Sequence, residues 1–244
     1  MFNLIKPIRL LVCFWIIFGI LSVNEIYSQA GTDIESQFKL KYQMWVQYRS
    51  KFISFRSDID PKIIFDNEPF REVVKLGVPV IPYMIEKQQE DHMLGHALYQ
   101  ITKWKYHIKR EGKTPSEYVW SVEEFPDMKQ KGGLPDSRKL WLHWWKEGRK
   151  LTYQHFGNLY LKWKEMREKE KYKEAEAQYQ RIIDLGIAAL PYLLEKVKQG
   201  EIELIPAISK LTDGKVKKDA TAQQCIRWWQ ENKESWLIPF PNKR

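Results

Sequence analysis

The chain has 244 residues and a net charge of +9, with 43% hydrophobic and 14% aromatic residues. This content excludes an intrinsically disordered chain. Cys13 and Cys225 are its two cysteines, and Cys13 lies in an N-terminal leader, so the folded part has no internal disulfide. No glycine-rich phosphate loop, G-x-S-x-G elbow or CxxC pair occurs, so the sequence shows none of these common enzyme signatures.

Residues 1–30 have the features of a secretory signal peptide. Lys6 and Arg9 precede an uncharged apolar run over 10–23, and Ser28 and Ala30 place small residues where a signal peptidase reads them. The run has about 14 residues, whereas a membrane-spanning helix needs about 20. We therefore expect cleavage after Ala30 and export to the periplasm or cell envelope. Retention of the segment as a membrane anchor is the alternative.

A long helix is predicted to follow the signal peptide. Residues 32–35 have the Thr-Asp-Ile-Glu pattern of a capping box. Large apolar side chains then recur along one helical face, at Ile34, Phe38, Trp45, Tyr48 and Phe52. This face is expected to pack against the rest of the fold.

Two stretches of the chain are similar to each other. Residues 72–87 read EVVKLGVPVIPYMIEK, and residues 181–196 read RIIDLGIAALPYLLEK. After a shift of one residue, 97–102 aligns with 207–212, and further on Trp144-Trp145 aligns with Trp228-Trp229. Because these landmarks occur in the same order, we interpret the chain as two related halves, 31–150 and 151–244.

The landmarks also predict helix boundaries. A Leu-Gly pair after an apolar run ends a helix, and the proline that follows it suits the first turn of the next one. A third helix is expected over about 93–103 and 202–211, where Pro206 opens or kinks the second copy. A fourth is expected after Asp136 or Ser137 and near Thr221. One long helix is predicted over 159–179, and Glu165 and Lys169 are spaced there for an i,i+4 pair.

No segment shows the sustained period-two alternation of a strand, so the predicted fold class is all-α. The helix pairs with a Leu-Gly turn, matched over 73–85 and 182–194, resemble HEAT-like and armadillo-like repeat proteins. This resemblance implies a short α-solenoid of two modules that serves as a binding scaffold. The unit of about 110 residues is longer than a single HEAT pair of about 40 to 47 residues.

The first half contains an insertion, at about 104–135, that is rich in aromatic and basic side chains. Long loops in compact domains are usually functional or disordered, and the aromatic residues argue against disorder. The residues that we expect to contact a ligand are Trp104, Tyr106, Lys109, Arg110, Tyr118 and Trp120. The alternative is a loop that packs its aromatic side chains back on the helices.

His92 and His96 are four residues apart on a predicted helix, so both could face one metal ion. The pair is half a site, because further ligands would have to come from elsewhere, such as His107 or His143. The pattern also lacks the glutamate of a metalloprotease helix. The alternative is that His96 faces the helix packing, since it aligns with Ile205 or Pro206.

The double tryptophans and Cys225 favour packing over chemistry. Adjacent residues of a helix point about 100° apart, so the two rings of a pair cannot face one groove. We expect one ring of each pair in the core and the other over a neighbouring helix. Cys225 aligns with Trp141, which predicts a buried, unreactive thiol.

We therefore expect an exported, non-catalytic binding or scaffold protein without a cofactor, whose partner is another envelope protein. One alternative is a protein that binds an anionic glycan or membrane surface, since residues 101–150 carry twelve basic and seven acidic side chains. Another is an envelope metalloenzyme that uses His92 and His96. Nucleic acid is not an expected partner of an exported chain.

Overall fold

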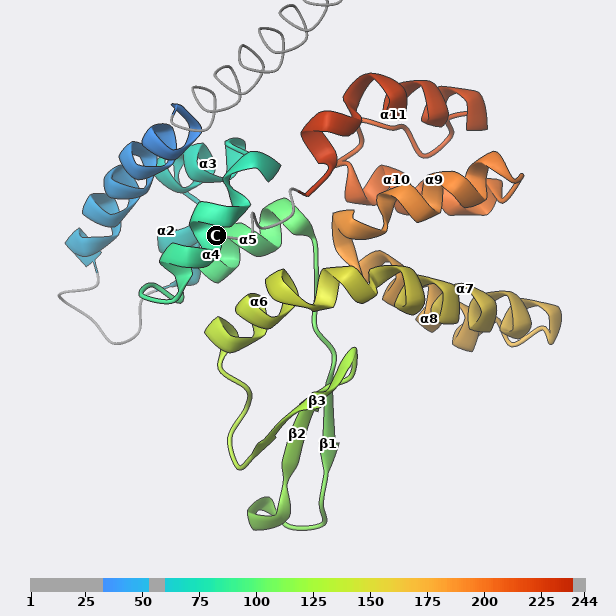
Figure 1. The fold of residues 1–244 in the computed structure, drawn as a ribbon, viewed down its shortest axis with the longest axis horizontal. Coiled ribbons are helices and arrows are strands. Elements are labelled where there is room, and N and C mark those ends of the chain that lie inside the picture. The colour runs from blue at the N-terminus through green and yellow to red at the C-terminus, as the bar shows by residue number, and fades with distance from the viewer. Residues whose placement is uncertain (1–32, 53–59, 239–244) are drawn as a thin grey trace, which may run out of the picture. The chain divides into compact units, whose positions relative to one another are not determined.

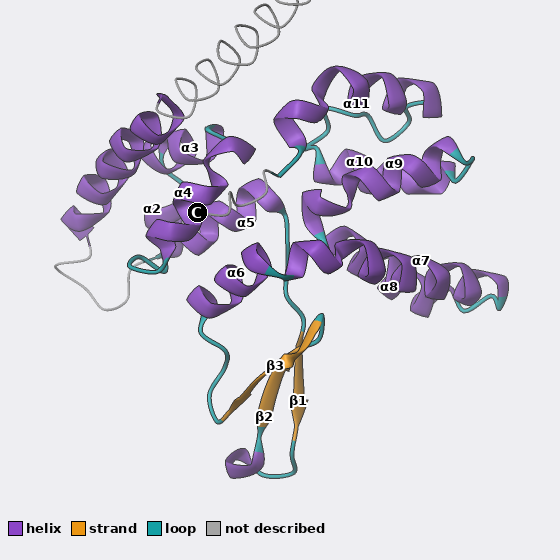
Figure 2. Cartoon of the chain, viewed as in Figure 1, coloured by secondary structure: helices purple, strands orange, loops and turns teal. Residues whose placement is uncertain are grey.

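The computed structural model describes residues 33–52 and 60–238, so the predicted signal peptide and Thr32 lie outside the described residues. The described part is mostly helical (Figure 2). No helix within it is long and apolar enough to cross a membrane. Backbone contacts divide the chain into one unit that ends at Leu76 and another that begins at Gly77, a boundary inside the predicted first half 31–150.

The first unit is helical over 33–52 and contains α2 (Pro61–Phe65) and α3 (Glu68–Lys75). Asn67 connects the last two, because its side chain donates to the Ile64 carbonyl and accepts from the Phe70 N–H. Trp45 is fully buried and donates from Nε1 to the same Ile64 carbonyl at 3.0 Å. Trp45, one of the residues of the predicted apolar face, is therefore the centre of the first unit's core.

The second unit begins with the 3-10 turn η1 (Val78–Val80), α4 (Ile81–Gln88) and α5 (Leu94–Thr102). After the insertion come α6 (Ser137–Lys146), η3 (Gly148–Leu151), α7 (Thr152–Glu168) and α8 (Tyr172–Asp184). The last elements of the described part are η4 (Gly186–Ala189), α9 (Leu190–Lys198), η5 (Ile202–Leu204), α10 (Ile205–Leu211) and α11 (Ala222–Trp236). Figure 1 shows α7 and α8 side by side, and their contact is the most extensive between elements of this unit.

Most of the predicted helix boundaries are confirmed. Asp136 caps α6 through the Arg138 N–H, and Thr221 caps α11 in a capping box with Gln224. Pro206 opens α10 and does not kink it, since it lies in the first turn. The ion pair between Glu165 and Lys169 is present at 2.6 Å.

The single long helix predicted over 159–179 is wrong. The chain forms α7 and α8 there, and the connection passes through Glu170, whose φ of 56° is left-handed. Neither glycine nor proline marks this break. The two helices instead pack against each other, and the buried Trp163 of α7 contacts Tyr179 of α8 with ring centroids 5.8 Å apart.

The all-α prediction also needs correction, because the insertion forms an antiparallel sheet. Strands β1 (Ile108–Glu111), β2 (Val119–Val122) and β3 (Phe125–Lys131) lie in the order β1-β2-β3, and η2 (Pro115–Glu117) lies between the first two. Strands β1 and β2 have four residues each, and the three residues that follow Ile108 in β1 are charged. β1 is too polar and β2 is too short to show sustained period-two alternation.

The two similar stretches have the same local geometry. Gly77 and Gly186 have φ values of 70° and 73°, and each begins or precedes a 3-10 turn. Pro82 and Pro191 each lie in the first turn of the helix that follows. The sequence similarity therefore corresponds to shared turns, although the repeat solenoid itself stays a prediction.

Candidate binding surface

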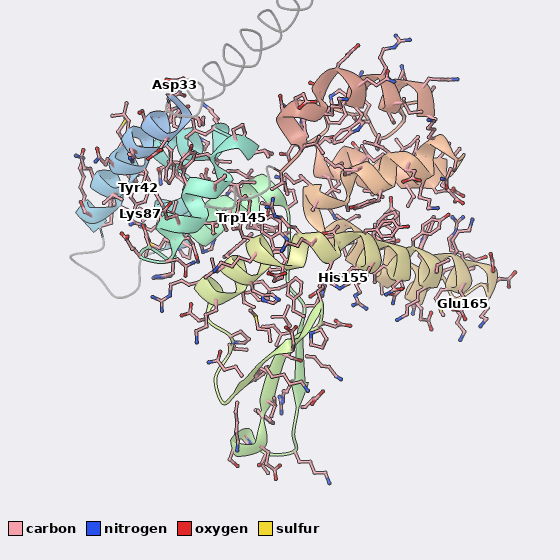
Figure 3. The ribbon with its side chains drawn as sticks, viewed as in Figure 1. Asp33, Tyr42, Lys87, Trp145, His155 and Glu165 are labelled. Atoms are coloured by element: carbon pink, nitrogen blue, oxygen red, sulfur yellow. The ribbon has the colours of Figure 1, made fainter. Side chains whose placement is uncertain are left out.

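The sheet is anchored at one end by Phe125. Its ring is 2% exposed and lies 4.7 Å from the ring of His143 and 6.2 Å from that of Trp104, measured between centroids. Gly148 permits this packing, because a Cβ there would lie 2.2 Å from the Phe125 ring. Figure 3 labels His155 on α7, whose ring completes this contact at 6.0 Å.

Polar contacts hold the same end of the sheet to α8. The Lys105 N–H donates to the Asp184 carbonyl at 2.8 Å, and the Asp184 carboxylate lies 3.2 Å from His107 Nε2. Arg181 forms an ion pair with Glu123 at 2.8 Å. The base of the sheet is therefore fixed by both packing and charge.

Protonation in this contact follows from its charges. The facing Asp184 carboxylate raises the pKa of His107, although partial burial opposes the shift. Burial raises the pKa of Asp184, but His107, Gln180 and Lys105 outweigh it and hold the net pKa below its usual value. A charged His107 and a charged Asp184 thus stabilise each other.

The other end of the sheet is solvated and has two different faces. Cross-strand partners share a face, and Arg110 is opposite Trp120, which is opposite Gln130. The Arg110 guanidinium lies 3.6 Å above the Tyr118 ring, and that ring contacts Trp120 edge to face. We call Arg110, Tyr118 and Trp120 the aromatic face.

The opposite side carries exposed lysines. Lys109 is opposite Ser121, which is opposite Lys129, and Val119 is opposite Lys131. Glu111 shares this side, and a hydrogen bond from Lys109 together with the charges of Lys109 and Lys129 lowers its pKa. We call Lys109, Lys129 and Lys131 the lysine face.

The structure therefore divides the six residues expected to contact a ligand. Trp104 is only 3% exposed and stacks on Trp144 with centroids 5.5 Å apart, so it belongs to the core. Tyr106 is 38% exposed beside it. Lys109 lies on the lysine face, while the remaining three form the aromatic face. The base of the insertion thus packs on the helices, as the alternative interpretation expects, and a ligand-binding role of its far end stays a prediction.

His92 and His96 do not share a helix in the structure. His92 lies in the turn before α5, and His96 lies within α5. Burial and then the charge of His92 lower the pKa of His96. Among the described residues, no group of three or more histidine, cysteine or carboxylate side chains is arranged to hold a metal ion.

The double tryptophans differ between the halves. Trp144 and Trp145 are both buried, at 1% and 6% exposed, whereas Trp228 and Trp229 are half-buried. Arg149 lies 3.9 Å above the Trp145 ring, which Figure 3 labels. Cys225 is buried, and burial raises the pKa of its thiol.

No protein-family model, curated protein or solved structure matches this chain. The HEAT-like resemblance accordingly stays a prediction from the sequence. The candidate site depends on the register of the sheet, which the sequence did not reveal. A signal was present in Val119-Trp120-Ser121-Val122, since β-branched and aromatic residues are typical of strands.

Proposed function

We propose that this chain is an exported, non-catalytic binding protein whose helices support the sheet as its contact element toward another protein of the cell envelope. The signal-peptide pattern of residues 1–30 supports export, and the resemblance to HEAT-like proteins supports a scaffold role. The aromatic face is the surface that we propose contacts the partner protein.

Arg110, Tyr118 and Trp120 are the central observation. Arginine, tyrosine and tryptophan are the residue types most enriched where protein interfaces concentrate their binding energy. Here they lie together at the solvated end of a sheet, with the guanidinium stacked on the Tyr118 ring. Arg110 is exposed and the two rings are half-buried, so the stacked group is ordered and still reaches solvent.

The anchored base supports the same function. Binding costs less entropy when the contact element is already ordered. Phe125 packs the sheet into the helices, and the ion pairs of Asp184 and Arg181 hold its base. The sheet is therefore preorganised to present either face.

The lysine face favours a second candidate function, which is binding of an anionic glycan or membrane surface. Lys109, Lys129 and Lys131 are exposed and lie on one side of the sheet. Binding by solvated charges weakens strongly with salt, whereas binding by aromatic contacts does so far less. The two candidates thus differ in a measurable way.

The test is capture from an envelope extract of the source organism on immobilised protein, at low and at high salt. Two matched variants separate the faces: Arg110→Ala with Tyr118→Ala, and Lys109→Gln with Lys129→Gln and Lys131→Gln. We expect one protein, retained at high salt, to be lost with the aromatic-face variant and kept by the lysine-face variant.

The opposite pattern would contradict the proposal in favour of the second candidate. In that case a glycan or lipid is retained at low salt alone and is lost with the lysine-face variant. Circular dichroism of both variants checks that the helices are intact. Equal retention by both variants would exclude the sheet as the contact element.

A further inference from the structure

A pocket of about 370 Å³ lies between the 215–220 loop and α11. Its lining includes Lys215, Val216, Lys217, Asp219, Gln224 and Trp228. This volume is in the range of small-ligand sites, which run from about 300 to 1,000 Å³. The pocket is separate in sequence from the sheet, so an inference from it does not rest on the function proposed above.

In the first half, a tryptophan makes the hydrogen bond that corresponds to the one made by Val216. The Trp104 N–H donates to Thr102 Oγ1 at 3.2 Å, and the Val216 N–H donates to the aligned Thr212 Oγ1 at 3.3 Å. Trp104 and Val216 therefore use the same acceptor, although Trp104 lies two residues after its threonine and Val216 lies four after its own. Both side chains are 3% exposed.

The size of these two side chains decides whether a pocket forms. Trp104 stacks on Trp144 at an interplanar angle of 27°, and Trp144 is 1% exposed. In the second half, the much smaller Val216 lies in the pocket lining with Trp228, the residue that aligns with Trp144. Trp228 is half-buried. In the first half an indole therefore packs on Trp144, whereas in the second half a small side chain and a pocket adjoin Trp228.

The charged groups around the pocket favour a negative ligand. Lys215 and Lys217 line it and are exposed, and Asp219 is the acidic residue in the lining. The Lys215 ammonium also lies 5.5 Å from the centroid of the Trp236 ring, which contacts the Trp228 ring edge to face. Gln224 accepts from the Thr221 N–H through Oε1, which leaves its Nε2 group to donate.

We propose that this pocket binds an aromatic ring that carries a carboxylate. The ring would stack on Trp228 as Trp104 stacks on Trp144, and Lys215 and Lys217 would hold the carboxylate. The ligand is a free aromatic acid or an aromatic side chain next to an acidic residue in a peptide.

The test titrates the full chain with three probes that share one ring and differ in charge: indole-3-acetate, indole and tryptamine. Binding is followed by the indole N–H resonance of Trp228 in a two-dimensional NMR spectrum, assigned with Trp228→Phe. We expect affinity to decrease from the anion to the neutral ring to the cation. The peptide acetyl-Asp-Trp-Asp-amide is the fourth probe, and its affinity relative to indole-3-acetate identifies the source of the ligand.

Three variants make the result specific. Val216→Trp fills the pocket, so it should abolish the shift for every probe. The double variant Lys215→Gln with Lys217→Gln should bind indole-3-acetate several-fold more weakly and should bind indole with unchanged affinity. Lys218→Gln is the matched control, since Lys218 is exposed beside the pocket but does not line it.

Two results would overturn the proposal. One is the absence of a saturable Trp228 shift with any probe up to about 10 mM, the weak end of the range in which specific binding is usually measured. The other is tryptamine binding as tightly as indole-3-acetate. Melting curves of each variant confirm that a lost shift does not come from unfolding.

Discussion

Lys103 and Asp213 occupy aligned positions in the two similar stretches, and their side chains form an ion pair at 2.9 Å. Each follows a fully buried threonine at the end of a helix, and their φ values are 57° and 52°. A left-handed backbone is uncommon at residues other than glycine. Its occurrence at both positions shows that α5 and α10 end in the same way, and the ion pair shows that these two ends lie close together.

The two threonines should contribute equally to stability. Thr102 Oγ1 donates to the Leu98 carbonyl and accepts from the Trp104 N–H, and Thr212 makes the corresponding bonds to Ile208 and Val216. Thr102→Val and Thr212→Val each leave a buried N–H without its acceptor, which costs about 1–3 kcal/mol. Urea unfolding measures this loss. Thr102→Ser and Thr212→Ser keep the hydroxyl and should lose less, and a loss confined to one half would contradict the shared geometry.

Gly186 is expected to be intolerant of any side chain. Its φ is 73°, and a Cβ there would lie 2.3 Å from the Thr102 carbonyl oxygen and 2.7 Å from the Trp104 nitrogen. Gly186→Ala adds a steric clash with backbone to a left-handed strain of about 1–2 kcal/mol, so unfolding should become easier by more than the strain alone.

Gly214→Ala is the matched control for this substitution. Its φ is 77°, but no heavy atom lies within 4 Å of the point that a Cβ would occupy there. Gly214→Ala should therefore lose only the stability that corresponds to the backbone strain, because its new methyl group meets no other atom. Equal melting temperatures for the two variants would mean that η4 does not pack closely on the end of α5.

Much of the helical layout could be predicted because its signals are local. Leu185-Gly186, Pro191 and Thr221 each determine a boundary through their own backbone or side chain. The break at Glu170 carries no such signal, because it is stabilised by the packing of α7 against α8. The sheet was missed for a related reason, since its strands depend on cross-strand pairing and on an anchor distant in sequence.

The candidate site shows the same limit. Arg110, Tyr118 and Trp120 were expected to bind from their residue types, but their common face depends on the register between β1 and β2. Trp104 was expected with them, yet it is buried against Trp141 and Trp144, which lie more than 30 residues away in the chain. Residue type therefore identified candidates, and tertiary contacts decided their roles.

Phe125 is expected to be the main anchor of the sheet. Phe125→Ala removes a ring that is 2% exposed, which costs about 3–5 kcal/mol for a buried phenylalanine. Gly148→Ala should also destabilise the fold, because the new methyl group would overlap the ring. In the Phe125→Ala variant, Gly148→Ala should lower the free energy of unfolding only slightly, because the ring that the new methyl group would overlap is absent. A double-mutant cycle by urea unfolding measures this coupling, and additive losses would show that Gly148 does not contact Phe125.

The ion pair of His107 and Asp184 predicts a pH dependence of stability. The folded state raises the pKa of His107 above 6.5, so this contribution is fully present below 6.5 and is lost as the pH rises through the folded value. The pKa of Asp184 is lowered below 3.8, so its contribution is present above 3.8 and is lost as the pH falls through the folded value. The pair should therefore stabilise the fold most between about pH 4 and pH 6.5.

The variant Asp184→Asn separates the pH dependence that comes from the His107–Asp184 pair from the pH dependence that comes from the other histidines. Burial lowers the pKa values of His96 and His155, which makes the fold less stable in acid, but both are unchanged in the variant. The free energy of unfolding, measured by urea titration from pH 5 to pH 9, should differ most between the two proteins at the acid end. The difference should shrink as the pH rises through the raised pKa of His107 and this residue loses its proton, while the contacts of Asp184 with Gln180 and Lys105 persist. A difference that stays constant across this range would mean that Asp184 does not stabilise the protonated form of His107. Packing alone would then hold the base of the sheet.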